Sequence, residues 1–131
     1  MALNILVVED NKRMRTKIND TLAKMDIEIN KIYQADNGKK GLELLKKHSI
    51  DLMLTDIDMP VMNGLEMLGL IRSDPNISEI PTIVLTSRRD MKLFNAITSS
   101  GLGYIHKPFS WRMLRKKVHN FKNGGSQHVV Q

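Results

Sequence analysis

The sequence predicts an α/β fold in which helices cover both faces of a parallel sheet. Short apolar runs alternate along its 131 residues with segments whose apolar side chains recur every three or four positions, which is the pattern of strands joined by crossover helices. Several runs are almost wholly apolar, as in strands buried on both faces. Several also end in an acid, a base or a hydroxyl, and ligands of open α/β sheets bind beyond such ends.

The first two strand and helix pairs are expected within the first 48 residues. Residues 5–8 are the first strand and residues 12–25 the first helix, whose apolar stripe has spacings of three and four. Residues 29–34 have the least distinct strand pattern. Asn37-Gly38 is expected to form a turn, and Leu42 with Leu45 marks a second helix.

The third and fourth pairs follow the same order. Residues 51–55 and 83–85 are apolar runs of strand length. After the first of these, Pro60 prevents an early helix start and Asn63-Gly64 is expected to turn the chain. The third helix then has its apolar stripe at Leu65, Leu68 and Ile71, and the fourth at Leu93, Phe94 and Ile97.

The last pair completes a single domain that we assign to residues 1–122. Residues 104–106 form the fifth strand, and Ser110 caps a helix with Trp111, Leu114, Val118 and Phe121 on one face. Asn123-Gly124-Gly125-Ser126 breaks that helix. Residues 123–131 are therefore expected to be a flexible tail or the stub of a linker.

Length and composition narrow the class of protein. A chain of this length fits one domain with one core. The absence of cysteine excludes disulfides and thiolate metal sites and favours a reducing compartment. No segment approaches the roughly 20 apolar residues of a membrane span, and the first apolar stretch stops at Glu9, too early for a signal peptide. We expect a cytoplasmic protein with no membrane partner.

The net charge of +6 is concentrated in the C-terminal part. Residues 91–131 contain seven lysines and arginines and no acidic residue, whereas residues 1–90 contain all 14 acidic residues. A basic stretch can bind nucleic acid or an acidic protein, but aromatic side chains do not alternate with these charges in a stacking pattern. We interpret the stretch as a solvated helix face and expect no direct nucleic-acid partner.

Three carboxylates follow two of the expected strands, Glu9 and Asp10 after the first and Asp56 after the third. They would repel one another unless a cation lay between them. An oxygen-only ligand set favours a hard ion, and a few carboxylates with room for water suit Mg²⁺. Among the three, Asp56 is the best nucleophile, because the other two can hold the metal while it forms an acyl phosphate.

A lysine and two hydroxyls follow the remaining strands. Lys107 comes after the fifth strand, and Thr86 and Ser87 come after the fourth. A point charge and hydroxyl donors can hold the anionic oxygens of a phosphoryl group. Carboxylates, metal, lysine and hydroxyls together indicate phosphoryl transfer.

The same residues carry a resemblance to a known family. The sequence contains Val7-Val8-Glu9-Asp10-Asn11, Thr55-Asp56-Ile57-Asp58-Met59-Pro60-Val61-Met62-Asn63-Gly64, Thr86-Ser87 and Lys107-Pro108-Phe109. In this order and spacing it resembles the receiver domains of two-component response regulators, over about residues 3–121. The resemblance implies a flavodoxin-like doubly wound sheet of five parallel strands in the order 2-1-3-4-5.

The resemblance also implies roles for individual residues. Asp56 matches the aspartate that accepts a phosphoryl group from a sensor histidine kinase or phosphotransfer protein. Glu9 and Asp10 match the acidic pair that positions Mg²⁺, and Asp58 matches the position whose backbone carbonyl is a further ligand. Lys107 matches the lysine that contacts the phosphoryl group.

Thr86 matches the family's switch hydroxyl and Tyr104 the aromatic residue that turns inward with it, although a core or edge aromatic would suit Tyr104 equally well. The implied output is a changed binding face on the fourth helix, fifth strand and fifth helix. Asp58 and Arg88 occupy positions that in the family influence hydrolysis of the phosphoryl group. We hypothesise that they pair across the site and shield it from water.

The fifth helix contributes a hypothesis about the downstream partner. Its basic residues have no acidic neighbours, which favours an acidic protein whose association is accelerated by charge. These residues are Arg112, Arg115, Lys116, Lys117 and Lys122.

Two other classes of protein remain as alternatives. Asp56 and Asp58 reproduce the spacing of the nucleophile and acid of haloacid-dehalogenase-type phosphatases, although that motif normally lies on the first strand of a longer chain. A basic nucleic-acid-binding module would need a recognition element that the sequence does not contain. We expect a phosphoacceptor that assists its own phosphorylation and dephosphorylation, and not a dedicated enzyme.

Overall fold

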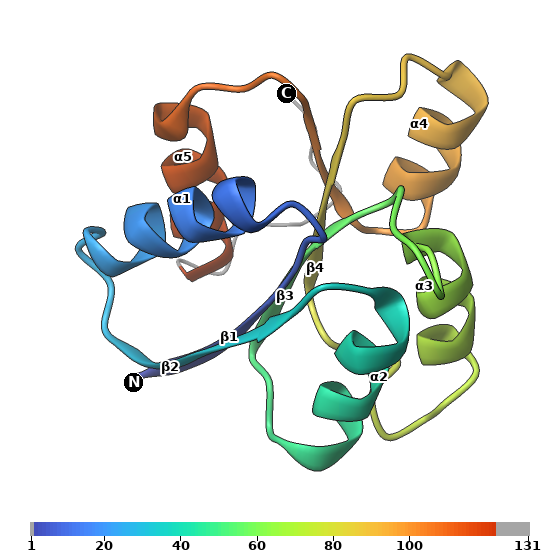
Figure 1. The fold of residues 1–131 in the computed structure, drawn as a ribbon, viewed down its shortest axis with the longest axis horizontal. Coiled ribbons are helices and arrows are strands. Elements are labelled where there is room, and N and C mark those ends of the chain that lie inside the picture. Colours follow the sequence, from blue (N-terminus) through green and yellow to red (C-terminus); the bar gives the residue numbers. More distant parts are fainter. Residues whose placement is uncertain (1, 123–131) are drawn as a thin grey trace.

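The computed structural model describes residues 2–122, which form one parallel sheet with helices on both faces (Figure 1). The expected tail at residues 123–131 lies outside the described residues. The elements in chain order are β1 (Leu3–Val8), α1 (Lys12–Ala23), β2 (Ile29–Ala35), α2 (Gly38–Lys47), β3 (Leu52–Asp56), α3 (Gly64–Arg72), β4 (Thr82–Thr86), α4 (Met91–Ser99), β5 (Gly103–His106) and α5 (Trp111–Lys122).

The sheet has the predicted topology. Its strand order is β2-β1-β3-β4-β5, and every neighbouring pair is parallel. The predicted flavodoxin-like α/β fold is therefore confirmed, including β2, whose sequence pattern was the least distinct. Between β1 and β3 the connections change direction along the sheet, and ligands of this fold bind at such a switch point.

Alternating side chains of the strands build a core on each face. Ile5 and Val7 of β1 pack with Ile18 and Leu22 of α1 and with Leu114 of α5. The intervening β1 residues, Leu6 and Val8, pack against α2 and α3 on the other face. In Figure 1, α1 and α5 accordingly lie on one side of the sheet and α2, α3 and α4 on the other. This burial, at about 25 cal/mol per Å² of apolar surface, fixes the strand register.

A third apolar cluster joins the end of β3 to α4. Ile57, directly after Asp56, is buried with Val84, Leu93 and Ile97, and Tyr104 of β5 packs against them. A change near the end of β3 can therefore reach α4 and β5 through packed side chains.

Two predicted turns are helix starts. Asn37 and Asn63 are N-cap residues whose side-chain oxygens accept from the backbone N–H of residues 40 and 66, both at 2.9 Å. Glu66 also accepts from the backbone of Asn63, which completes a capping box. Asparagine followed by glycine suits both a tight turn and a capped helix start, so the local pattern did not distinguish them.

Candidate functional site

The parallel register brings the polar strand ends together. Val8 is level with Thr55, Asp56 with Leu85, and Thr86 with His106. Glu9, Asp56, Thr86 and Lys107 consequently lie at the same carboxyl edge of the sheet. Tyr104, by contrast, lies within β5, opposite Val84 of β4.

Three carboxylates form the centre of the site. One oxygen each from Glu9, Asp10 and Asp56 lies within 4.8 Å of the others. The side chains of Glu9 and Asp56 are buried, whereas Asp10 is exposed. An oxygen-only cluster that opens to solvent on one side fits a hard divalent ion that keeps some of its water, such as Mg²⁺.

Lys107 is the cation that the structure places against these acids. Its Nζ lies 2.9 Å from Oε1 of Glu9 and 3.4 Å from Oδ2 of Asp56. Lys107 follows β5 and its peptide bond to Pro108 is cis. The ammonium, which follows the outermost strand β5, bridges the acids at the ends of β1 and β3.

The burial of these charges shifts their pKa values. Burial raises the pKa of Glu9 above its usual value of 4.5, and the negative charge of Asp56 acts in the same direction against the hydrogen bond from Lys107. Burial alone would lower the pKa of Lys107, but the hydrogen bonds and charges of Glu9 and Asp56 outweigh it and raise that pKa. The site thus holds a protonated Lys107 and a Glu9 carboxyl group that is costly to ionise in the absence of a metal ion.

Backbone groups fix the two buried carboxylates. The N–H of Asn11 donates to Oε2 of Glu9 at 3.1 Å, and the N–H of Ile57 donates to Oδ1 of Asp56 at 2.7 Å. The loop after Asp56 is closed by Gly64, because its N–H donates to the carbonyl of Ile57 at 2.7 Å. A Cβ on Gly64 would lie 2.3 Å from the carbonyl oxygen of Asp56, so only glycine fits there.

The hydroxyls and the aromatic residue lie around β4 and β5. Thr86 is buried and its Oγ1 accepts from the N–H of Arg88 at 3.1 Å. Ser87 is exposed at the end of β4. Tyr104 is half-buried, packs edge-on against Phe94 with 4.9 Å between ring centroids, and donates to the carbonyl of Arg88 at 3.5 Å. The backbone of Arg88 therefore connects Thr86 to Tyr104.

Arg88 and Asp58 meet as the sequence hypothesis expects. Nη2 of Arg88 lies 2.5 Å from Oδ1 of Asp58, and Nε donates to both carboxylate oxygens. Both side chains are exposed. The hydrogen bond that Arg88 donates to Asp58 is also the main reason that the pKa of Arg88 is raised.

Arg15 is a site neighbour that the sequence did not reveal. Its Nη1 donates to the backbone carbonyl of Glu9 at 2.6 Å and its Nε to Oε1 of Gln34 at 3.2 Å. A basic residue on an amphipathic helix usually indicates solvent exposure. The only sequence signal was its position, five residues after Asp10.

The fold and the site together define a class of protein. A buried carboxylate at a strand end, flanked by an acidic pair, a lysine and a hydroxyl at the switch edge of a doubly wound sheet, is the arrangement of a receiver domain. Residues 5–119 match the family described as the response regulator receiver domain. The chain belongs to this family.

Individual relatives agree with this assignment. Chemotaxis protein CheY-3 of Vibrio cholerae is 32% identical over 117 residues, which cover 88% of this chain and 88% of that protein. The sensor histidine kinase TmoS of Ectopseudomonas mendocina is 38% identical over 117 residues but the match spans only 12% of its length.

Solved structures show the same fold. The chemotaxis response regulator CheY4 of Vibrio cholerae superimposes with a TM-score of 0.79 at 25% identity, over 92% of this chain and 98% of that one. The protein is thus a receiver domain of the CheY-like type, and the phosphatase alternative receives no support. Within residues 2–122, no helix is long and apolar enough to cross a membrane.

Proposed function

We propose that Asp56 accepts a phosphoryl group from a phosphohistidine of a sensor kinase or phosphotransfer protein. The observation that carries the proposal is the position of Lys107, whose Nζ reaches both Asp56 and Glu9 while the carboxylate of Asp10 completes the acidic cluster. Such a cluster can orient an incoming phosphoryl group and neutralise its charge.

The chemistry of the transfer follows from these positions. An oxygen of Asp56 forms the new bond to phosphorus while the bond from phosphorus to the donor imidazole nitrogen breaks, and the released imidazole takes up a proton. The N–H of Ile57 holds the other carboxylate oxygen and so directs the nucleophilic one. Lys107 stays close by as a fixed positive charge for the phosphoryl oxygens.

The metal-binding residues of the proposal are Glu9, Asp10, Asp56 and the backbone carbonyl of Asp58. When bound, Mg²⁺ would supply positive charge to the transferred phosphoryl group. Glu9 is held ready for this by Asn11 and Lys107. In this proposal, Thr86, Ser87 and Lys107 contact the phosphoryl oxygens.

The switch in this proposal uses Thr86 and Tyr104. A phosphoryl group on Asp56 would draw the Thr86 hydroxyl away from the N–H of Arg88. The carbonyl of Arg88 accepts the hydrogen bond of Tyr104, so the movement would reach that side chain. The phosphoryl group adds roughly −1.5 to −2 charges, which favours that movement. The face made by α4, β5 and α5 then changes, because Tyr104 packs with Leu93 and Ile97 of α4.

An acidic protein is the partner that this face suits best. Arg112, Arg115 and Lys116 are exposed on α5, and burial followed by the charge of Lys116 lowers the pKa of Lys117. A positively charged surface accelerates association with a negatively charged one. The association rate should fall with rising salt, and a rate insensitive to salt would contradict an acidic partner.

Two further points belong to this proposal. Asp58 and Arg88 tune the lifetime of the acyl phosphate, and the protein acts as a phosphoacceptor that assists its own reactions instead of turning over a separate substrate. We also propose residues 1–122 as the functional unit, with residues 123–131 as a tail or linker.

The proposal is tested by incubating the protein with acetyl phosphate and MgCl₂ and measuring its intact mass. We expect the mass to increase by one phosphoryl group when MgCl₂ is present. No increase is expected when EDTA is added before acetyl phosphate. Asp56→Asn should remain unmodified, with Asp51→Asn as the control that retains labelling. Labelling of Asp56→Asn to the wild-type level would refute the role of Asp56. Turnover of a generic phosphomonoester would favour a phosphatase.

A further inference from the structure

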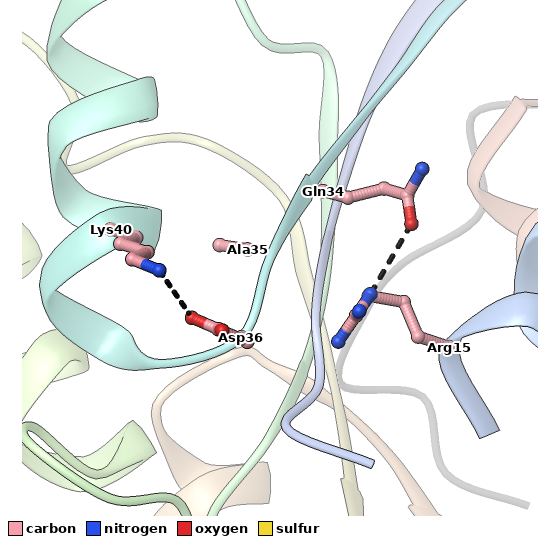
Figure 2. Close-up of a pocket in the computed structure, with 5 residues that line it drawn as sticks. All are labelled: Arg15, Gln34, Ala35, Asp36 and Lys40. Carbon is pink, nitrogen blue, oxygen red and sulfur yellow. Dashed lines mark hydrogen bonds and ion pairs between the residues drawn. The ribbon is translucent and has the colours of Figure 1, made fainter. Parts of the chain in front are cut away.

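Arg15 of α1 contacts the peptide that joins the two acidic residues of the site. Its Nη1 donates to the carbonyl oxygen of Glu9 and its Nε to the side chain of Gln34 at the end of β2. Figure 2 shows the guanidinium beside Gln34, in a pocket of about 320 Å³ that Asp36 and Lys40 also line. Arg15 therefore links α1, the loop after β1 and the edge strand.

The carbonyl that Arg15 holds controls both acids. It belongs to the peptide unit between Glu9 and Asp10, which is planar, so fixing its direction restricts the dihedral angles on either side. The N–H of Glu9 is in turn bonded to the carbonyl of Ala35 at 3.0 Å. The backbone of Glu9 is thus tied to β2 on one side and to α1 on the other.

We propose that Arg15 is a positioning residue for the metal site. By joining the Glu9 carbonyl to Gln34, it holds Glu9 and Asp10 in the orientation that a divalent cation requires. Within the described residues, the hydrogen bonds of Arg15 go to a carbonyl and an amide and not to a carboxylate, so it acts through the backbone. The inference rests on the proposed function, because it assumes that the acidic pair binds Mg²⁺.

The charge of Arg15 alone would have the opposite effect. A positive charge near a cation site repels the cation, so its removal would tighten Mg²⁺ binding. Loss of orientation weakens binding, and groups that orient metal ligands contribute roughly 10- to 100-fold in affinity. The direction of the change therefore distinguishes positioning from simple electrostatics.

The test is a titration of the metal-free chain with MgCl₂, followed through the backbone amide NMR signals of Asn11 and Ile57. These N–H groups bond the carboxylates of Glu9 and Asp56 and report directly on the site. Arg15→Ala should raise the Mg²⁺ dissociation constant by roughly tenfold. At saturating MgCl₂, its rate of labelling by acetyl phosphate should return to that of the wild type.

Arg13→Ala is the matched control, because it removes the same charge from the same helix, and Arg13 lines a pocket together with Lys107 of the site. It should leave the dissociation constant unchanged or lower it. Gln34→Ala retains the charge but removes one anchor and should weaken binding in the same direction as Arg15→Ala. Arg15→Lys should be intermediate, because an ammonium cannot span both acceptors in the geometry of a guanidinium. These two variants carry the test if circular dichroism shows that Arg15→Ala does not fold.

The outcomes separate the inference from the function on which it rests. If the wild type responds to MgCl₂ and Arg15→Ala binds as tightly or more tightly, positioning by Arg15 is wrong and the proposed function stands. Equal weakening by Arg13→Ala also refutes positioning. If the wild type does not respond to MgCl₂, both proposals fall.

Discussion

Arg88 and Asp58 form a two-pronged ion pair between the loops that follow β4 and β3, with 2.5 Å between Nη2 and Oδ1 and 3.2 Å between Nε and Oδ2. The two loops flank the strand end that carries Asp56. A pair in this position can restrict the approach of water to an acyl phosphate on Asp56.

Removal of this pair should shorten the life of the phosphoryl group. Arg88→Ala is expected to accelerate loss of phosphate by up to about fivefold, because an exposed ion pair contributes at most about 1 kcal/mol. The measurement is the decay of phosphorylated protein after removal of acetyl phosphate. Arg89→Ala, an adjacent exposed arginine, should decay as the wild type does. An unchanged decay in Arg88→Ala would end the shielding hypothesis.

The raised pKa of Glu9 predicts a dependence of stability on pH. In the unfolded chain Glu9 ionises near its usual pKa of 4.5, whereas burial delays ionisation in the folded chain. The contribution of Glu9 to the free energy of unfolding is therefore fully present below pH 4.5. It is lost as the pH rises through the pKa that Glu9 has in the folded chain.

Glu9→Gln should accordingly gain stability relative to the wild type as the pH rises from 4.5 to 7 in EDTA. The measurement is the free energy of unfolding in urea at each pH. MgCl₂ should reverse the advantage of Glu9→Gln at pH 7, because a glutamate at position 9 contributes a charged metal ligand and a glutamine does not. A difference that is constant with pH would show that burial of Glu9 imposes no cost of ionisation.

Val61 has a backbone conformation that disfavours its own side chain. Its φ is 68° and its side chain is 77% exposed, so a β-branched residue bears left-handed strain without compensating burial. Val61→Asn should raise the free energy of unfolding by about 1 kcal/mol in urea. Val61→Ala should recover less, since alanine lacks the short polar side chain with which asparagine hydrogen-bonds its own backbone in this conformation. A loss of stability in Val61→Asn would contradict the strain.

The tight contact at Gly64 offers a comparison within one helix. A Cβ there would meet the backbone of Asp56 and Ile57, whereas a Cβ on Gly69 meets nothing within 4 Å. Gly64→Ala should therefore destabilise the protein and impair labelling of Asp56. Gly69→Ala should stabilise it by about 0.5–1 kcal/mol, as alanine does in helix interiors. Similar effects from the two substitutions would contradict the close approach.

The sequence predicted the fold and the meeting of Glu9, Asp56 and Lys107, because each of these side chains lies at the end of a parallel strand. Once five parallel strands are assigned, Glu9, Asp56 and Lys107 must meet at one edge, and their chemistry then suggests the site. The helix starts at Asn37 and Asn63 were less predictable, because asparagine and glycine serve turns and caps alike. Arg15 escaped prediction because a side chain that bonds a carbonyl leaves the same sequence pattern as a solvated one.

Asp56 is proposed to carry the phosphoryl group as an acyl phosphate, and the position of that group can be located directly by mass spectrometry. After labelling with acetyl phosphate and MgCl₂, borohydride reduces an acyl phosphate to an alcohol, which tandem mass spectrometry assigns to one residue. We expect reduction at position 56 alone, where the carboxylate faces Lys107. Reduction at position 9, 10 or 58 with position 56 intact would contradict it.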